Sequence, residues 1–458
     1  MGLFVQSNFN LETPLAAPKG FLLAPKPLAS LDDYIAIGGG QGLKRALTMT
    51  SADIIAEVKK AGLRGRGGAG FPTAIKWTTI SQSPCPTRYL VCNAAEGEPG
   101  TFKDRTMIRR NPYQLVEGIQ VAALAIHAKK CFIGMKTSFE REYLRLSAAI
   151  DEMAAHGLIH TPVQIVRGPE DYLLGEERAL LEVIEGKEAM PREADNPPYQ
   201  IGLFTRTMFD VYEPNPTDVN NAETLSNVGH ILREGADWFH SMGSADTPGT
   251  MVFTICGDVQ TPGVYELPMG TPLRELVEVH GGGTRPGRKV KAIYSGVTNP
   301  VITADHLDTP LDFGSMRKIG AGLGSGGYIV YDDSTCMVRV AHRYAEFLWL
   351  ESCGQCSSCK DGGHTATIHL RKLVEGTGNS VDLAAAIQAA VKAPSGTRCF
   401  LPSELANIVP STADAYHDEF VSHFYRGCQG HADITVPKIA DFDESARNFI
   451  YTHGRTTP

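Results

Sequence analysis

The chain has 458 residues, of which 42% are hydrophobic and 21% are charged, and this length predicts roughly three domains. Its formal net charge of −8 argues against a nucleic-acid partner, because binding to a phosphate backbone requires a basic face. No apolar stretch approaches the ~20 residues that span a membrane.

The first 30 residues contain several prolines and no regular hydrophobic period. This pattern predicts an arm that packs on a neighbouring protein or on the next domain. The segment also lacks the positive flank, apolar run and cleavage site of a signal peptide. We therefore expect a protein of the reducing cytoplasm, either free or on the cytoplasmic side of a membrane complex.

Residues 31–245 are predicted to form an α/β domain. Helices and strands are expected to alternate, with helices at 51–61, 113–128 and 138–156 and strands at 88–93 and 131–135. Ser51 is the predicted N-cap of the first helix, and Gly62 ends it. The βαβ rhythm predicts a mostly parallel sheet.

A glycine-rich loop follows the first helix. Residues 62–70 contain five glycines in nine positions, which lets backbone N–H groups approach an anion. Arg64, Arg66 and Lys76 add positive charge. The loop follows a helix rather than a strand, so it is not a Rossmann fingerprint. A flexible turn is the alternative, and we interpret the loop as an anion cradle.

Two carboxylates, Glu96 and Glu98, follow the strand 88–93 among glycines. Ligands gather at the carboxyl ends of strands in open α/β sheets. Carboxylates accept hydrogen bonds from ribityl or ribose hydroxyls, so we interpret both as binding groups, with a solvated acidic turn as the alternative. The charges of residues 101–105 are expected to cap the next helix.

Two further turns carry polar residues. Residues 172–178 are predicted to run from a strand into a helix with Glu176 and Glu177 at its N-terminus, where acids favour the helix dipole. One of these carboxylates could instead face a nucleotide ribose. The Asn220-Asn221 turn with Thr224 either caps a helix or contacts a flavin.

A second domain is predicted at 246–335, after a break in the pattern at 243–249. Strands at 251–257, 263–267 and 290–294 and a helix at 272–279 predict a small α+β unit of β-grasp-like order. The glycine loop at 322–327 lacks basic residues close on its carboxyl side, and we interpret it as a turn.

Helices dominate the predicted third domain, residues 336–440, which a tail at 441–458 follows. Cys353, Cys356 and Cys359 have C-x2-C-x2-C spacing, and Cys399 is the best candidate for a fourth ligand, since the intervening segment reads as two helices. Four thiolates are the usual ligands of a 4Fe-4S cluster. A zinc site is the alternative, although zinc ligands usually come in two pairs.

The other six cysteines have no metal-binding spacing among themselves, and we expect buried free thiols at all of them. They are Cys85, Cys92, Cys131, Cys256, Cys336 and Cys428.

The order of these motifs over residues 31–430 resembles the flavin-bearing, NADH-oxidising subunit of respiratory complex I and its relatives in NAD-linked hydrogenases and formate dehydrogenases. The segments that carry the resemblance are 62–73 with Lys76-Trp77, Asn93-Ala94 with 96–105, Gly175-Glu176-Glu177, Asn220-Asn221 with 223–225, and 351–356 with Cys359.

The resemblance implies a Rossmann-like flavin domain, a β-grasp domain of the soluble-ligand-binding type and a C-terminal helical bundle that carries the 4Fe-4S cluster. It implies FMN held by Gly65, Arg66, Gly67, Lys76, Asn93, Glu96, Gly175, Glu176, Asn220, Asn221 and Thr224. It implies NAD held by Gly68, Gly70, Phe71, Glu98 and Glu177. NAD is expected to be preferred over NADP, because a carboxylate repels a 2′-phosphate.

The implied activity is that of an NADH:acceptor oxidoreductase, of the NADH-quinone oxidoreductase type. A hydride passes from NADH to FMN, and single electrons then pass to the cluster, with no acid-base residue needed. The implied partners are a small thioredoxin-like 2Fe-2S subunit and a larger iron-sulfur subunit. The alternative is an FMN and iron-sulfur electron-transfer subunit that does not use NADH directly. Four departures from the family pattern favour it: Thr78, Ala95, Glu170-Asp171 and residues 207–214.

Overall fold

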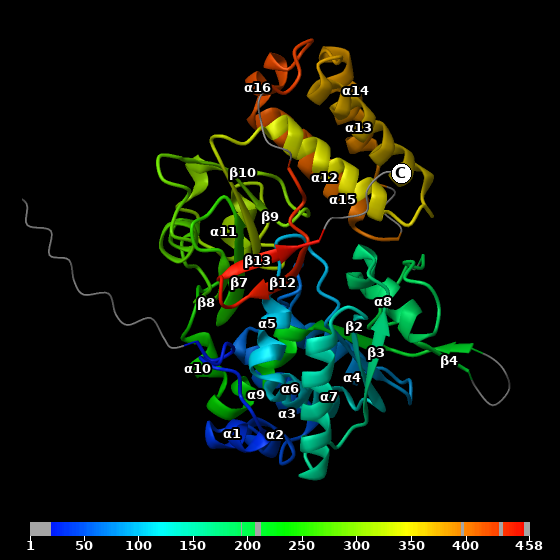
Figure 1. The fold of residues 1–458 in the computed structure, drawn as a ribbon. Coiled ribbons are helices and arrows are strands. Elements are labelled where there is room, and N and C mark those ends of the chain that lie inside the picture. The colour runs from blue at the N-terminus through cyan, green and yellow to red at the C-terminus, as the bar shows by residue number, and fades with distance from the viewer. Residues whose placement is uncertain (1–19, 194, 207–211, 395–397, 430–433, 453–458) are drawn as a thin grey trace, which may run out of the picture.

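The computed structural model describes residues 20–193, 195–206, 212–394, 398–429 and 434–452. The chain forms three parts in sequence order: an α/β part at the bottom of Figure 1, a five-stranded sheet in the middle and a helical bundle at the top. The predicted α/β class is confirmed, and the three parts meet around one region in the centre.

The first part is built on a four-stranded parallel sheet of order β3-β2-β1-β6. Its strands are β1 (Tyr89–Asn93), β2 (Lys130–Lys136), β3 (Val163–Gly168) and β6 (Thr217–Asn221). Its helices are α1 (Leu31–Ala36), α2 (Gln41–Ala46), α3 (Ser51–Ala61), α4 (Thr73–Ser81), α5 (Lys103–Arg110), α6 (Pro112–Ile126), α7 (Glu140–Ala155), α8 (Glu177–Ile184), α9 (Ala222–Glu234) and α10 (Ala236–His240).

Both faces of this sheet are buried. Leu90 and Cys92 of β1 belong to the large apolar cluster that includes α6 and α9, while Val91 packs in a second cluster with Leu180 and Leu181 of α8. Alternate side chains of a strand point to opposite faces, so β1 is buried on both. Its end, Asn93, lies opposite Asn221 of β6. The register therefore brings the acidic turn that follows β1 and the Asn220-Asn221 turn to one edge of the sheet.

Two local predictions need correction. The N-cap of α3 is Thr50, not Ser51, because the Thr50 hydroxyl accepts from the Asp53 N–H in a capping box. Residues Tyr172–Gly175 form one 3-10 turn, η1, rather than the end of a strand, since β3 already ends at Gly168. The predicted helices near 113–128 and 138–156 and the strands near 88–93 and 131–135 are confirmed.

The second part is a mixed sheet of order β10-β9-β11-β7-β8. Its elements are β7 (Thr250–Gly257), β8 (Gly263–Pro268), η2 (Glu275–His280), β9 (Val290–Ser295), β10 (Ile302–Thr303), η3 (Ala304–His306), α11 (Phe313–Lys318) and β11 (Gly327–Asp332). The expected helix at 272–279 is found at residues 273–280, and its last six residues, η2, are π-helical. Glu266 on β8 accepts from the N–H groups of Phe21, Leu22 and Leu23, so the described end of the N-terminal arm packs on this sheet.

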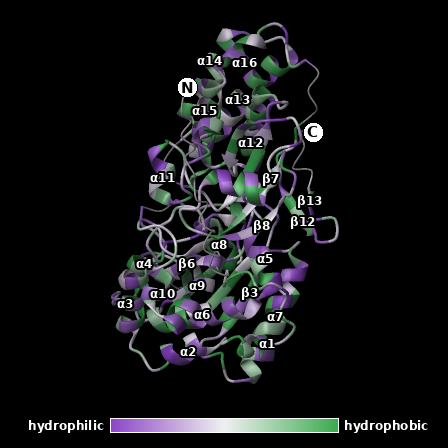
Figure 2. Cartoon of the chain, turned by 90° about the vertical axis from the view of Figure 1, so that its left-hand side faces the viewer, coloured by the Kyte–Doolittle hydropathy of each residue, from purple (hydrophilic) through white to green (hydrophobic). Residues whose placement is uncertain are grey.

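The third part is a bundle of five helices: α12 (Met337–Glu351), α13 (Ser357–Glu375), α14 (Ser380–Lys392), α15 (Leu401–Ala415) and α16 (His417–Ser422). Figure 2 shows the apolar residues of α12 where it crosses the bundle. The two helices expected between Cys359 and Cys399 are α13 and α14. Within the described ranges, no helix is both long and apolar enough to cross a membrane.

Two hairpins complete the chain. The pair β4 (Phe204–Arg206) and β5 (Tyr212–Pro214) flanks residues 207–211, so most of the segment predicted to depart from the family at 207–214 lies outside the described residues. The predicted tail begins within β12 (Ile439–Asp443), which pairs with β13 (Asn448–Tyr451). Arg109 of α5 contacts Asp441 at 2.6 Å, so the C-terminal hairpin packs back on the first part.

A buried ionic network joins the first and second parts. Glu223 of α9 accepts from the Val252 N–H of β7 at 2.8 Å and lies 2.7 Å from Lys103 Nζ. Arg66 donates to the carbonyl oxygens of Pro248 and Thr250. Each buried charge thus has an opposite charge or a hydrogen-bond partner, as burial requires.

We predict that Glu223→Gln destabilises the protein by about 3–5 kcal/mol, because it leaves the Lys103 ammonium short of a buried counter-charge. Calorimetric thermal unfolding measures the change. Glu234→Gln at the exposed end of the same helix is the matched control, with an expected effect below about 0.5 kcal/mol. Equal shifts for the two variants would contradict this assignment.

Candidate functional site

A cavity of about 530 Å³ lies where the three parts meet. This volume falls within the range of about 300–1,000 Å³ that is typical of pockets for cofactor-sized ligands. The first part contributes most of the wall, including Gly67, Gly68, Ala69, Asn93, Ala95, Glu96, Gly97, Glu98, Thr101, Lys103, Asp104, Tyr172, Leu173, Gly175, Glu176 and Asn221. The second part contributes Thr298, Asn299, Gly324 and Ser325, and the third contributes Cys399, Phe400, Leu401 and Glu404.

The glycine-rich loop closes on itself at the mouth of this cavity. The Gly65 N–H donates to the Phe71 carbonyl at 2.9 Å, so the loop between them is held as a compact turn. Gly67 and Gly68 line the cavity, and Gly68 has a φ of +129°, which side chains rarely adopt. The missing Cβ atoms leave backbone open to a ligand, as the anion-cradle interpretation requires.

The positive side chains of this loop are engaged within the protein. Arg66 is fully buried and donates to backbone carbonyls of the second part, and burial lowers the pKa of its guanidinium to about 10. Lys76 donates to the Val219 carbonyl at 3.0 Å and lies 3.8 Å from Glu177. Neither residue lines the cavity, and the Arg66 N–H is bonded to Thr224, so the contacts of Arg66 and Lys76 with FMN stay predictions.

Lys103 is the positive group of the cavity wall. Its ammonium lies 2.9 Å from Asp104 and 2.7 Å from Glu223, and it donates to Asn221 Oδ1 at 3.1 Å. Burial alone would lower the pKa of Lys103, but the carboxylates of Asp104, Glu223 and Glu96 raise it above its ordinary value. The charges of residues 101–105 were expected to cap a helix, so Lys103 was not predicted as part of the site. The sequence feature that could have identified Lys103 is its position shortly after Glu96 and Glu98, the acids that follow β1.

The asparagines occupy two different environments. Asn93 donates to the Gly175 carbonyl at 2.8 Å and lines the cavity, as does Asn221, which also caps α9. Asn220 points away and accepts from the Trp77 indole N–H at 3.1 Å. Thr224 accepts from the Arg66 N–H at 2.8 Å. The structure therefore brings Asn93 and Asn221 to the cavity and uses Asn220 and Thr224 to support it.

Glu96 and Glu176 each accept hydrogen bonds from the N-terminus of a helix. Glu96 accepts from the N–H groups of Lys103 and Asp104 at the start of α5 and lies 3.2 Å from Arg105 Nε. Glu176 accepts from two N–H groups at the start of α8, both at 2.8 Å. Both residues also line the cavity, so each one caps a helix and forms part of the cavity wall.

Glu98, Tyr172 and Glu404 form a buried hydrogen-bonded group in the cavity wall. The Tyr172 hydroxyl lies 2.6 Å from Glu98 Oε2 and 3.0 Å from Glu404 Oε1. A hydroxyl carries one hydrogen, so one of the two carboxyls must be protonated and donate to the tyrosine oxygen. Glu98 also accepts from the Val297 N–H and the Thr298 hydroxyl, which favours its ionised form.

Burial raises the pKa of both Glu98 and Glu404. Burial, followed by the charge of Glu98, raises the pKa of Glu404 well above its ordinary value. A carboxyl group buried next to a second carboxylate keeps its proton for these two reasons. Glu404 lies 306 positions after Glu98, and sequence pattern gave no signal for it.

The remaining predicted nucleotide residues lie outside the cavity wall. Phe71 is 39% exposed and stacks on Tyr199, with 6.2 Å between ring centroids. The Glu177 side chain is 38% exposed. Gly70 has a φ of +63°, and a Cβ there would meet the Phe313 ring. None of these three residues lines the cavity, and their role in NAD binding stays a prediction.

All four predicted cluster ligands converge. Cys353, Cys356, Cys359 and Cys399 line one small enclosed space beside the cavity. Leu173, Cys399 and Leu401 line both spaces, so a single layer of side chains separates them. The thiol set is the donor chemistry that iron prefers in iron-sulfur clusters, and the residues present fit a 4Fe-4S group.

The residues around the large cavity likewise have the chemistry that a flavin nucleotide requires. Its wall combines glycine backbone, one ammonium, three asparagines and several hydroxyl groups, of which those of Thr101 and Ser325 lie 3.1 Å apart. The loop at 322–327 is a turn as expected, and it also contributes Gly324 and Ser325 to the wall. Ala95 is fully buried in the wall where relatives were expected to carry an acid.

Comparison with known families agrees with this geometry. Residues 58–230 match the Nuo51 FMN-binding domain, residues 252–299 match the SLBB domain, and residues 339–423 match the NADH-ubiquinone oxidoreductase-F iron-sulfur binding region. The three matches follow the three parts of the fold. They define the protein as one that combines an FMN-binding domain with an iron-sulfur-binding region.

Individual relatives cover most of the chain. The F 2 subunit of the NADH-quinone oxidoreductase of Rhizobium meliloti (strain 1021) is 41% identical over 413 residues, 88% of this chain and 96% of the relative. The HndC subunit of the NADP-reducing hydrogenase of Solidesulfovibrio fructosivorans is 35% identical over 86% of this chain and 80% of the relative. A crystal structure of an NAD⁺-reducing [NiFe]-hydrogenase in the H2-reduced state superposes with a TM-score of 0.77 at 31% identity, covering 89% of this chain and 68% of that chain. The chain belongs to the family of NADH-quinone oxidoreductase F subunits.

The buried Glu176 carboxyl should make the stability of the folded protein depend on pH. Burial raises the pKa of Glu176 from 4.5 to about 7, so between these values the folded protein holds a proton that the unfolded chain releases. Wild-type stability should therefore fall as pH rises through this window, by up to about 3 kcal/mol. Glu176→Gln keeps an acceptor oxygen and cannot ionise. We expect its melting temperature, relative to wild type, to rise between about pH 5 and about pH 8.

Glu177→Gln is the control, since Glu177 lies on the same turn with a side chain that is 38% exposed. Its melting temperature relative to wild type should stay nearly constant over the same range. A difference for Glu176→Gln that does not change with pH would show that the Glu176 carboxyl titrates normally.

Proposed function

We propose that this protein oxidises NADH and passes the electrons through FMN and a 4Fe-4S cluster to partner subunits. FMN, when bound, accepts a hydride from NADH and releases electrons one at a time to an iron-sulfur cluster. The observation that carries the proposal is the shared wall of Leu173, Cys399 and Leu401 between the cavity and the four cysteines. It leaves a short path from the flavin cavity to the cluster thiols.

The residues of the wall divide into two roles. Gly67 and Gly68 expose backbone, and Asn93, Asn221 and Lys103 present amides and an ammonium to a bound flavin nucleotide. Glu96 and Glu176 hold the first turns of α5 and α8 in position. No side chain needs to act as a general base, because a hydride carries its proton equivalent with its electrons.

The buried group of Glu98, Tyr172 and Glu404 holds a proton between two carboxyls at the cavity wall. The Tyr172 hydroxyl lies 2.6 Å from Glu98 Oε2 and 3.0 Å from Glu404 Oε1, which fixes the two carboxyls relative to each other.

We infer that the three parts correspond to a Rossmann-like flavin unit, a β-grasp unit and a cluster-bearing bundle. The exposed Phe71 ring and the Glu177 carboxylate flank the approach to the cavity and suit an adenosine ribose, with NAD preferred over NADP. The expected electron acceptors are a small thioredoxin-like 2Fe-2S subunit and a larger iron-sulfur subunit. The names of the relatives, which are subunits of quinone reductases and hydrogenases, support a place in such a complex.

The decisive experiment mixes the flavin-loaded, cluster-containing protein with NADH in an anaerobic stopped-flow instrument. We expect the absorbance band of the oxidised flavin to bleach rapidly with NADH and slowly with NADPH. A band that persists with both nucleotides but bleaches with dithionite would contradict NADH oxidation. It would favour an electron-transfer subunit supplied by a partner protein, as Ala95 suggests.

Cys359→Ser tests the assignment of the cluster. Serine is a poor ligand for iron in such sites, so iron should fall from about four atoms per chain toward zero. Flavin content and bleaching of the flavin by NADH should remain, because Cys359 does not line the flavin cavity. Cys85→Ser, at a half-buried thiol in the first part, should keep all its iron. Full iron in Cys359→Ser would exclude this residue as a ligand.

A further inference from the structure

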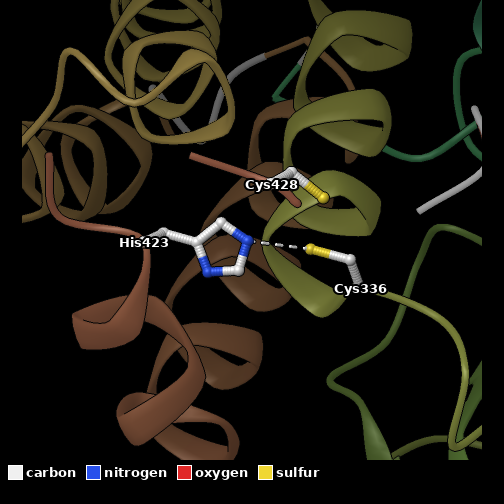
Figure 3. A group of neighbouring side chains, drawn as sticks. All are labelled: Cys336, His423 and Cys428. Atoms are coloured by element: carbon white, nitrogen blue, oxygen red, sulfur yellow. Dashed lines mark hydrogen bonds between the residues drawn. The ribbon is translucent and has the colours of Figure 1, made fainter. Parts of the chain in front are cut away.

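Three residues from separate segments form a second group of metal-ligating side chains. Cys336 immediately precedes α12, His423 immediately follows α16, and Cys428 lies five positions further on. Figure 3 shows the two sulfur atoms and the imidazole ring turned toward one another. Buried free thiols were predicted at both cysteines, because the six cysteines outside the cluster motif have no metal-binding spacing among themselves.

The ligand atoms converge closely enough to bind a single ion. Cys336 Sγ and His423 Nε2 are 3.2 Å apart, and all three ligand atoms lie within 4.8 Å of one another. Among the residues that the structure describes, no other group of three or more His, Cys, Asp or Glu side chains meets that limit. The four cluster cysteines surround a larger space, as a four-iron group requires, whereas this group would enclose one ion.

The imidazole is held in the orientation that a metal ligand needs. His423 Nδ1 lies 2.7 Å from the Glu419 carbonyl oxygen, to which it donates. That bond fixes the proton on Nδ1 and leaves the Nε2 lone pair free, directed at the sulfurs. A metal-ligating histidine almost always donates its other nitrogen to a carbonyl or a carboxylate in this way.

The two thiols are also held in position. Cys336 is fully buried at the N-cap of α12, and its carbonyl oxygen accepts from the Val340 N–H at 3.1 Å. Cys428 is half-buried, and its N–H donates to the Val374 carbonyl of α13 at 2.8 Å. The backbone around each ligand is thus fixed before an ion binds.

We propose that Cys336, His423 and Cys428 bind one Zn²⁺ ion. Two thiolates and one neutral imidazole balance the charge of the ion, and binding releases the two thiol protons. Thiolate and imidazole are the ligands that zinc prefers in tetrahedral sites. Three protein ligands leave the fourth position to water, which can reach it beside the half-buried Cys428.

The site lies in the same bundle as the cysteine quartet but uses none of its residues. The ion would tie the start of α12 to the end of α16 and, through the backbone contact of Cys428, to α13. Since α12 leads directly into Cys353, and α13 contains Cys359, the ion would fix both helices that deliver the cluster ligands. The ion therefore has a structural role, because it stabilises the bundle that carries the cluster.

Metal analysis of the complete purified protein tests the proposal. Inductively coupled plasma mass spectrometry should find about one zinc per chain in addition to the iron. His423→Ala and Cys428→Ser should each lose the zinc and retain the iron, while Cys85→Ser should retain both. Loss of zinc should also lower the melting temperature of the protein.

Cobalt provides a readout that does not depend on variants that fold poorly. After removal of zinc by a chelator, the wild-type chain should bind one Co²⁺ with visible bands of a tetrahedral site and thiolate charge-transfer bands in the near ultraviolet. Three results would overturn the proposal: iron-replete protein that takes up neither Zn²⁺ nor Co²⁺, zinc that persists in both variants, or a Cys336–Cys428 disulfide in the freshly purified protein.

Discussion

The position of Lys103 is the constraint on which the central cavity depends. Its ammonium is buried at the point where α5, the turn before α9 and the second sheet meet, so it can be tolerated only with carboxylates on more than one side. Glu223 supplies one and Asp104 another, and Glu223 in turn binds the backbone of β7. The pairing that satisfies the lysine also aligns the second part on the first. The cavity wall and the domain junction are consequently parts of the same ionic network.

The acidic residues around the cavity do not carry free charge. Glu96 and Glu176 accept from helix N-termini, Glu98 is surrounded by three donors, and burial beside Glu98 raises the pKa of Glu404. Negative charge that is offset by helix dipoles and N–H groups repels an anionic ligand far less than an exposed carboxylate would. This explains how a chain with a net charge of −8 can present an acid-rich wall to a phosphate-bearing cofactor.

Hydrophobic periodicity and cysteine spacing predicted much of the fold and the residues of the cluster site. The buried strand β1 and the long helices α6 and α7 follow from periodicity, and the four cluster cysteines from spacing and helix count. Residues that enter the cavity from later segments, such as Ser325 and Glu404, gave no signal, because their proximity depends on how three parts pack. The direction of the Arg66 side chain could not be predicted either, since the carbonyls that accept from it lie more than 180 positions away in the sequence. Cys336 and His423 are 87 positions apart, beyond the reach of any spacing rule.

The hairpin of β12 and β13 has a consequence for the mobility of the cavity wall. Arg105, which contacts Glu96 in that wall, also donates to the carbonyl oxygens of Ile439 and Ala440, and the Gly100 N–H donates to the Pro437 carbonyl. The loop between β1 and α5 is thus held by a segment more than 330 positions away in the sequence. Local unfolding of this hairpin would release the loop as well, so opening of the hairpin and access to the cavity are coupled.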